Sequence, residues 1–221
     1  MSFIRSAGRR PDSREPRYGV FLRPDPATAW ALTQLTFALQ QQFGLVSAAA
    51  FAPHATLVGN LALDAPVEEL VDALTRVFDR TSPIPIVNRG IERTATGMFA
   101  GTFRCDIHHD ASGSVNAPLR DVAEAVKAAV LPLSRPVEDY LTVPVADYEF
   151  RGHLSVVSHE LALDPGLGDE LEEFIGGLPI ELPREFVAEW FTLFELRADW
   201  DGPWWEDQSW RHLRSWRVAA R

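Results

Sequence analysis

Two histidines lie in nearly identical short segments of this chain. The segment Pro53-His54-Ala55-Thr56-Leu57-Val58 is matched by Gly152-His153-Leu154-Ser155-Val156-Val157, and both read His-x-(Thr/Ser)-apolar. The apolar, β-branched surroundings favour strands, and residues two apart on a strand share one face. Each segment therefore presents an imidazole beside a hydroxyl group. Two such pairs facing each other would supply a base, an acid and two hydrogen-bond donors without a metal.

The similarity continues beyond the histidines. Leu61-Ala62-Leu63-Asp64 follows the first motif and Leu161-Ala162-Leu163-Asp164 follows the second, and acidic helix starts come next, at Glu68 and at Asp169. A single His-x-Thr is a weak signal, but two copies with the same continuation indicate an internal duplication. Each copy is predicted to run strand, short turn, helix.

The paired motifs resemble those of the two-histidine (2H) phosphoesterase superfamily, and the hydroxyl residues are most similar to the cyclic phosphodiesterase branch, which has the RNA 2′,5′-ligase-like fold. The resemblance covers residues 18–218. It implies an α+β fold with two pseudo-symmetric β-sheet lobes, outer helices and a central cleft lined by the motifs. It also implies that His54 and His153 are the general base and acid, that Thr56 and Ser155 donate hydrogen bonds to phosphate oxygens, and that no cofactor is needed.

The chemistry of these groups agrees with that resemblance. Phosphodiester hydrolysis needs a water deprotonated, a leaving oxygen protonated and the charge on the other phosphate oxygens stabilised. An imidazole with a pKa near 6.5 can do either proton transfer near neutral pH. One neutral and one charged imidazole together do both, each contributing roughly 10²–10⁴ in rate. The sequence does not assign which of His54 and His153 is the base.

Hydrophobic periodicity predicts the elements that hold the motifs. Strands are expected at residues 18–22, 51–58, 84–93, 98–107, 150–157, 186–197 and 210–218, and helices at about 26–43, 67–78, 119–130 and 167–178. This mixed order indicates an α+β or mixed α/β domain rather than a doubly wound nucleotide fold. Residues 131–149 are expected to be irregular. Residues 1–17 contain five arginines and are expected to form a flexible basic tail, and residues 18–221 a single bilobal domain.

Composition limits the possible partners. The chain has 221 residues, 46% of them hydrophobic, which is enough for one sizeable core, and a formal net charge of −10. This charge argues against long duplex nucleic acid as a ligand, but a small phosphate ester in a local pocket remains compatible. A single cysteine, Cys105, precludes an internal disulfide and fits a cytoplasmic, reducing location. No apolar run is long enough to span a membrane, so no membrane partner is expected.

Other polar residues are assigned structural roles. His159 is expected at the end of the second motif strand, and the 108–110 stretch (His-His-Asp) in a solvated loop rather than a metal site. Cys105 is expected to be a buried, inert thiol. Trp204 and Trp205 would either cover the cleft or pack the C-terminal hairpin. Aromatic residues on neighbouring strands are candidates for binding a base or ribose: Tyr18, Phe21, Phe103 and Trp190.

The preferred hypothesis is a metal-independent phosphodiesterase, acting as a monomer on a small nucleotide-type ester such as a 2′,3′-cyclic phosphate. One alternative is an enzyme that acts on 2′,5′ linkages or on the ends of short RNA. Its binding would depend strongly on salt. A second alternative is a non-catalytic nucleotide-binding module, which would bind a nucleotide tightly without turnover.

Overall fold

The computed structural model describes residues 10–95, 100–139, 141–157, 159–162 and 164–220. Its helices and strands alternate irregularly along the chain, as expected for an α+β fold. The helices are α1 (Pro26–Phe43), α2 (Val67–Phe78), α3 (Ala117–Val130) and α4 (Gly168–Gly177). The strands are β1 (Arg17–Arg23), β2 (Ala55–Leu63), β3 (Ile84–Val87), β4 (Ile91–Arg93), β5 (Phe103–Asp106), β6 (Ser134–Arg135), β7 (His153–Val157), β8 (Glu185–Ala188), β9 (Trp190–Arg197) and β10 (Ser209–Arg217).

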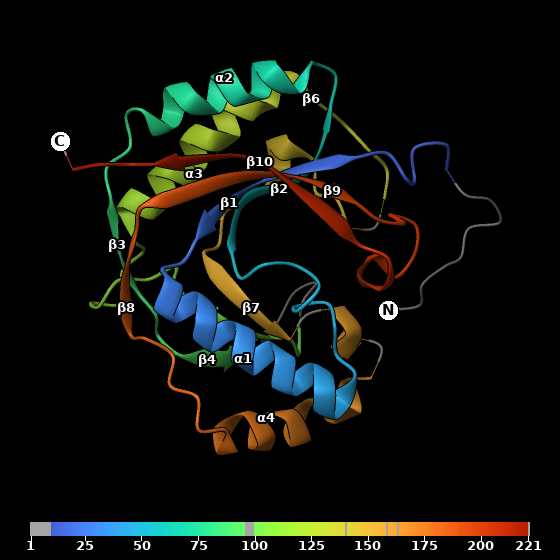
Figure 1. Ribbon diagram of the computed structural model, residues 1–221, viewed down its shortest axis with the longest axis vertical. Coiled ribbons are helices and arrows are strands. Elements are labelled where there is room, and N and C mark those ends of the chain that lie inside the picture. Colours follow the sequence, from blue (N-terminus) through green and yellow to red (C-terminus); the bar gives the residue numbers. More distant parts are fainter. Residues whose placement is uncertain (1–9, 96–99, 140, 158, 163, 221) are drawn as a thin grey trace.

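The first motif belongs to a five-stranded antiparallel sheet with the order β10-β9-β1-β2-β6. Strand β2, which carries the motif, pairs with the central strand β1, where Phe21 lies opposite Thr56. Helices α2 and α3 pack against each other and cover one face of this sheet (Figure 1). The opposite face is therefore free of these helices and carries Phe21 and Thr56.

The second motif belongs to a smaller antiparallel sheet with the order β4-β5-β7. Helix α1 lies across β7, and the α1 residues Leu32 and Leu35 share a hydrophobic cluster with Leu154 of β7 (Figure 1). Helix α1 begins at the Asp25 cap, whose carboxylate accepts hydrogen bonds from the backbone N–H groups of two residues in the first turn. It ends at Gly44, which has the left-handed φ of 71° that favours glycine. The sheets thus form the two predicted lobes.

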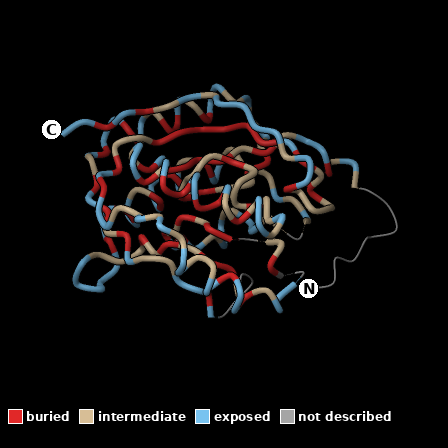
Figure 2. The backbone as a smooth tube through the Cα atoms, turned by 60° about the horizontal axis from the view of Figure 1, so that its bottom comes forward, coloured by how far each residue is buried: buried red, intermediate tan, exposed pale blue. Residues whose placement is uncertain are grey.

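One continuous hydrophobic cluster joins the lobes. It contains Val20 and Leu57 from the larger sheet, Val156 from the smaller sheet, and Val126 from α3. In Figure 2 the buried backbone runs through the strands, and the exposed stretches lie on the outer helices and loops. Because the lobes share this core, we expect it to hold the two motif strands in a constant relative position.

The structure differs from the predicted strands where local hydrogen bonds interrupt pairing. The strand predicted over 84–93 is divided into β3 and β4, because the backbone turns at Gly90, with φ of 95°, and the Asn88 side chain accepts the Gly90 N–H. The strand predicted over 186–197 is likewise divided, since β8 pairs with β3 whereas β9 pairs with β1. The strand predicted over 98–107 is described only from residue 100 on, where β5 begins at 103.

The two copies of the repeat also diverge after the motif. Leu61 and Leu63 continue strand β2, but Leu161 lies in a 3₁₀-helix, η3 (His159–Ala162), because β7 ends at residue 157. The Glu160 carboxylate in η3 accepts hydrogen bonds from the backbone N–H groups of Val46 and Ser47. This contact ties the segment after the second motif to the loop that leads into the first.

The described part of the predicted basic tail lies against the C-terminal loop. Arg10 donates to Asp201 over 2.6 Å and Arg14 donates to Asp207 over 2.7 Å. Arg17 is fully buried at the start of β1. These ion pairs hold the segment from Arg10 to Arg14 against the C-terminal loop, whereas residues 1–9 of the predicted tail lie outside the described residues. No helix among the described residues is long and apolar enough to cross a membrane.

Candidate active site

The side chains of the first motif alternate between half-buried and fully buried positions, as predicted. His54 immediately precedes β2, and His54 and Thr56 are half-buried while Ala55 and Leu57 are fully buried. The apolar residues point into the core beneath α2 and α3, so the imidazole and the hydroxyl share the opposite face. Phe21 of β1 lies opposite Thr56 on that face.

The second motif repeats the arrangement on β7. His153 and Ser155 are half-buried, whereas Leu154 and Val156 are buried. Across the pairing with β5, His153 lies opposite Asp106 and Ser155 lies opposite Arg104. Directly opposed residues on paired strands lie on the same face, so a carboxylate flanks this histidine and a guanidinium flanks this hydroxyl.

The two motifs meet between the lobes. Strands β2 and β7 are in contact, and a positive charge on His153 lowers the pKa of His54. Tyr148, in the segment that leads into β7, donates a hydrogen bond of 3.3 Å from its hydroxyl to the backbone carbonyl of Thr56. The structure therefore brings the two predicted imidazole–hydroxyl pairs to one place.

Both imidazoles are held in the same way. His54 Nδ1 lies 2.7 Å from the carbonyl oxygen of Ala52, and His153 Nδ1 lies 2.8 Å from that of Arg151, each two residues earlier in the chain. A carbonyl can only accept, so Nδ1 carries the proton in both rings. Nε2 is then the atom that takes up or releases a proton. This shared backbone clamp orients two potential acid–base groups.

The surroundings of His54 are aromatic. The rings of Phe21 and Phe51 stand edge-on to the imidazole, with centroids 4.5 and 4.7 Å away. Burial lowers the pKa of His54 to about 4, against the raising effect of the Ala52 carbonyl and together with the charge of His153. His54 is therefore neutral near pH 7 and suited to accept a proton.

The surroundings of His153 are charged. Burial is the main cause that lowers its pKa, and Arg104 adds to this effect, whereas the Arg151 carbonyl, Asp106 and Glu92 raise the pKa. Carboxylates raise the pKa of His153 and so oppose the effect of burial, whereas no carboxylate is among the causes of the pKa shift of His54. The two motifs are thus alike in sequence and unlike in the charges that surround their histidines.

The predicted substrate-binding aromatics occupy different positions. Phe103 and Phe21 are only 2% and 3% exposed, so neither presents a free ring face, and Phe103 is a core residue rather than a binding residue. Tyr18 lies on the helix-covered face of the sheet. It is three residues from Phe21 on β1, so the two side chains point to opposite faces. Trp190 is half-buried on the same face as Phe21, with the guanidinium of Arg23 at 4.5 Å from its ring centroid.

The residues predicted to be structural have contacts of their own, and His108 among them accepts a hydrogen bond of 3.3 Å from the Gly152 N–H, next to the second motif. His159 packs edge-on against Trp204 and stacks on Trp205, with centroids 5.2 and 6.0 Å away. Trp205 is buried, so these tryptophans pack the C-terminal loop onto η3 and are not a free lid. Cys105 is buried and its pKa is raised to about 12. Among the described residues, no group of three His, Cys, Asp or Glu side chains could hold a metal ion.

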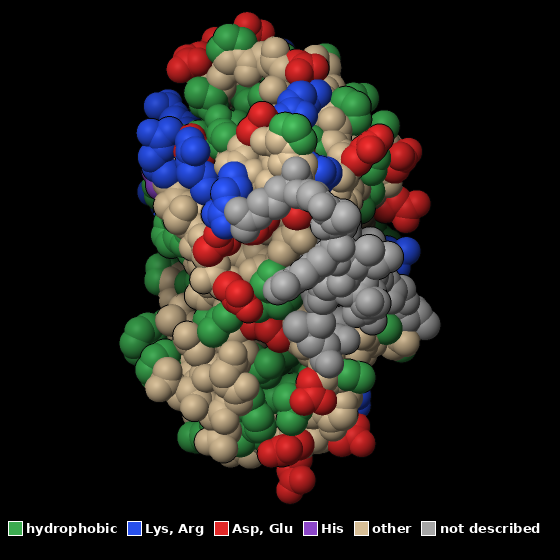
Figure 3. Space-filling view, turned by 90° about the vertical axis from the view of Figure 1, so that its right-hand side faces the viewer, with side chains coloured by type: hydrophobic (Ala, Val, Ile, Leu, Met, Phe, Trp, Pro, Cys, Tyr) green, Lys and Arg blue, Asp and Glu red, His purple; other side chains and the backbone are tan. Residues whose placement is uncertain are grey.

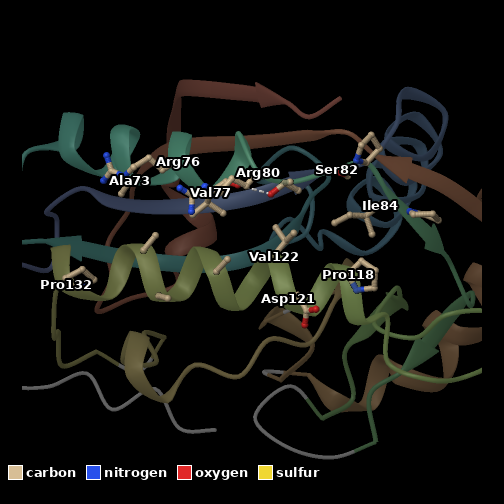
Figure 4. Close-up of a pocket in the computed structure, with 16 residues that line it drawn as sticks. Ala73, Arg76, Val77, Arg80, Ser82, Ile84, Pro118, Asp121, Val122 and Pro132 are labelled. Atoms are coloured by element: carbon tan, nitrogen blue, oxygen red, sulfur yellow. Dashed lines mark hydrogen bonds between the residues drawn. The ribbon is translucent and has the colours of Figure 1, made fainter. Parts of the chain in front are cut away.

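Arg104, Asp106 and Tyr148 surround the second motif but were not predicted. The alternation of Arg104 and Asp106 with the apolar Cys105 in a predicted strand was a usable signal, since it marks a polar face. These three residues also line a hollow of about 500 Å³ next to the site. A larger hollow, of about 740 Å³, lies between α2 and α3, where Val77 and Val122 face each other (Figure 4). No motif residue lines this larger hollow.

By sequence, the chain matches no protein-family model and no curated protein. By structure, it is similar to TT0787 of Thermus thermophilus, with a TM-score of 0.56 and 16% identity over 91% of this chain and 97% of that one. It is also similar to E. coli LigT complexed with NADP+, with a TM-score of 0.58 and 10% identity over 93% and 100%. A structure described as a phosphoesterase gives a TM-score of 0.51 and 11% identity over 92% and 98%. These similarities extend over nearly the whole of each protein, and the chain has the two-histidine phosphoesterase fold.

Proposed function

We propose that this protein is a phosphodiesterase that hydrolyses a small nucleotide-type ester, a 2′,3′-cyclic phosphate or a related cyclic phosphate, without a metal ion. The observation that carries the proposal is the pair of imidazoles, each clamped through Nδ1 by a carbonyl two residues earlier and each accompanied by a hydroxyl on its own face. The fold, which is that of the phosphoesterase structures, agrees with it.

The two environments favour distinct roles. His54, with a pKa of about 4, is the general base: its Nε2 takes a proton from water as the water oxygen attacks phosphorus. His153 is the general acid: its Nε2–H protonates the leaving oxygen as the P–O bond breaks. With a cyclic phosphate this opens the ring and yields a phosphomonoester with a free hydroxyl. A second proton exchange with water restores both rings.

Charge on the non-bridging oxygens needs stabilisation in the transition state. Thr56 and Ser155 lie on the faces of their histidines and donate hydrogen bonds to these oxygens. Arg104 lies opposite Ser155 on the neighbouring strand and adds a positive charge there, although Glu92 already accepts a hydrogen bond of 3.0 Å from its Nε. A positioned guanidinium is well suited to a phosphate group.

A nucleotide is the proposed substrate class. E. coli LigT was crystallised with 3′-AMP, with ATP and with phosphate, and a nucleotide carries both the phosphate that the motifs need and a flat base. The net charge of −10 disfavours a long nucleic acid. Lys and Arg side chains nevertheless gather on part of one face (Figure 3), so local attraction of a phosphate is compatible with the overall charge.

The test is hydrolysis of a panel of 2′,3′-cyclic nucleotides, other cyclic phosphates and 2′,5′-linked dinucleotides in excess EDTA. We expect turnover of at least one cyclic nucleotide to a monoester at a rate that EDTA does not change. Loss of turnover in EDTA, with recovery on adding a divalent metal, would contradict the metal-free mechanism. Tight nucleotide binding with no turnover at any pH would instead favour a non-catalytic binding module.

A second candidate substrate is the end of a short RNA. Arg217 of β10 supports it, because this arginine is exposed and lies opposite Trp190 on the face of the first motif, where it can attract a phosphate beyond the reacting one, although Glu189 accepts a hydrogen bond of 3.1 Å from it. Binding of a short RNA would then weaken steeply with salt, while binding of a mononucleotide would weaken less. Equal salt dependence for both ligands would leave the mononucleotide as the preferred substrate.

The pH profile should reflect the two environments. Activity requires neutral His54, so kcat/KM should rise as pH increases through about 4. It also requires charged His153, whose pKa is lowered from 6.5, so the fall in kcat/KM on the alkaline side should have its midpoint below pH 6.5. We therefore expect a bell-shaped curve with its maximum below pH 6.5. Measurement of kcat/KM from pH 3.5 to 8 tests this, and a value that still rises above pH 7 would contradict the assignment.

A further inference from the structure

A chain of aromatic rings runs from the first catalytic histidine to the protein surface. Phe51 contacts His54 at 4.7 Å and also contacts Trp210 of β10 at 5.3 Å, both edge-to-face. Phe194 contacts Phe51 at 5.0 Å and Trp210 at 5.3 Å. Trp210 is thus the second ring from the histidine that is proposed to activate water.

Trp210 differs from the rest of this chain of rings by its exposure. Phe21, Phe51 and Phe194 are buried together in a small cluster, and each is at most 8% exposed. Trp210 is 45% exposed. Only an exposed ring can offer a face to a ligand, so the buried phenylalanines form a wall and Trp210 is the ring of this wall that a ligand can reach.

The strand register places Trp210 on the side of the first motif. On β9, Trp210 lies opposite Leu196 and His212 lies opposite Phe194. Phe194 lies opposite Gly19 of β1, two residues from Phe21, which itself lies opposite Thr56. Residues two apart share a face. Trp210, His212 and the Thr56 hydroxyl therefore project from the same face of the sheet.

Gly19 allows the wall to pack closely. A Cβ at this position would lie 2.1 Å from the Phe21 ring, so that ring lies directly over the backbone of β1. The wall is thus fixed by the fold. Strand β10 is the edge of the sheet, so no further strand of this sheet covers Trp210 and His212 from the side.

The exposure of Trp210 on the face of the first motif suits a ligand that carries a base. An exposed aromatic ring is a surface on which unpaired nucleobases stack, because every base has a π-face. Building on the proposed function, we propose that Trp210 is the stacking platform for the nucleobase of the substrate whose phosphate lies between His54 and His153.

The test compares substrates with and without a base. We expect Trp210→Ala to lower kcat/KM for adenosine 2′,3′-cyclic phosphate about tenfold, within the range for one stacked base, and to leave ribose 2′,3′-cyclic phosphate unchanged. Trp210→Phe should keep most of the activity on the nucleotide. Trp30→Ala is the matched control, because Trp30 is 64% exposed on α1, and it should change neither substrate.

A binding measurement separates this inference from the proposed function. Calorimetry of 3′-AMP and of inorganic phosphate requires no turnover. If the wild-type protein hydrolyses neither substrate but Trp210→Ala weakens 3′-AMP binding and not phosphate binding, the platform stands and the enzymatic proposal fails. Equal losses on both substrates, no loss on the nucleotide, or no detectable 3′-AMP binding together with no turnover would overturn the platform.

Discussion

Replacing either motif histidine by alanine is expected to lower kcat/KM by about 10²–10⁴. His54→Ala removes the proposed base, which would take the proton from water, and His153→Ala removes the proposed acid, which would protonate the leaving oxygen. Both side chains are half-buried and are not core residues, so circular dichroism and urea unfolding should show folded proteins. Steady-state kinetics on the best cyclic nucleotide of the panel measures the loss.

The double variant distinguishes a joint mechanism from two separate effects. Because the two rings act in one proton-transfer cycle, the His54→Ala, His153→Ala protein should be little slower than the worse single variant. His159→Gln is the control, since His159 packs against the tryptophans of the C-terminal loop, and the folded variant should keep a rate near wild type. A folded single-alanine variant that retains most of its activity would remove the two-histidine mechanism.

The sequence predicts the four motif residues as one site because two independent signals coincide. Alternation with period two assigns His54 and Thr56 to one face of a strand, and the same holds for His153 and Ser155. The duplication then makes each copy of the motif a stronger indication of function than a single copy would be. The helices were also predictable, since α2 and α3 have regular apolar stripes such as Leu70 and Leu74 that the structure buries. These are local properties of the chain.

The neighbours of the motifs depend on long-range register, which sequence periodicity does not contain. Arg104 lies beside Ser155 only because β5 pairs with β7 in one particular register, with an irregularity next to Phe103. Tyr148 reaches Thr56 from an irregular stretch, and Phe51 reaches His54 from a loop. No local pattern specifies such contacts.

The difference between the two halves of the site arises from these long-range neighbours. In sequence the motifs are nearly interchangeable, and the roles of their histidines could not be assigned. In the structure, aromatic rings enclose His54, whereas Asp106 and Arg104 flank His153. A base benefits from an environment that keeps it neutral, and an acid benefits from nearby carboxylates that keep it charged. The proposed division of labour thus rests on the neighbours and not on the motifs.

The hydroxyl groups should matter mainly in the transition state. Thr56→Ala and Ser155→Ala are each expected to lower kcat by about 10²–10³, as when one oxyanion donor is removed, with little change in KM. The loss should be smaller at Ser155, because Arg104 lies opposite it and can still donate to the same oxygen. The double variant Ser155→Ala, Arg104→Gln should then lose as much kcat as Thr56→Ala does.

Conservative exchange and an exposed threonine provide the controls for this prediction. Thr56→Ser keeps the donor and should retain most of the rate, whereas Thr56→Val keeps the shape, lacks the donor and should resemble Thr56→Ala. Thr33→Ala changes an exposed threonine on α1 and should leave kcat at the wild-type value. If Thr56→Ala and Ser155→Ala raised KM and left kcat unchanged, the hydroxyls would bind the substrate and the transition state equally. Their proposed role in stabilising the developing charge would then be wrong.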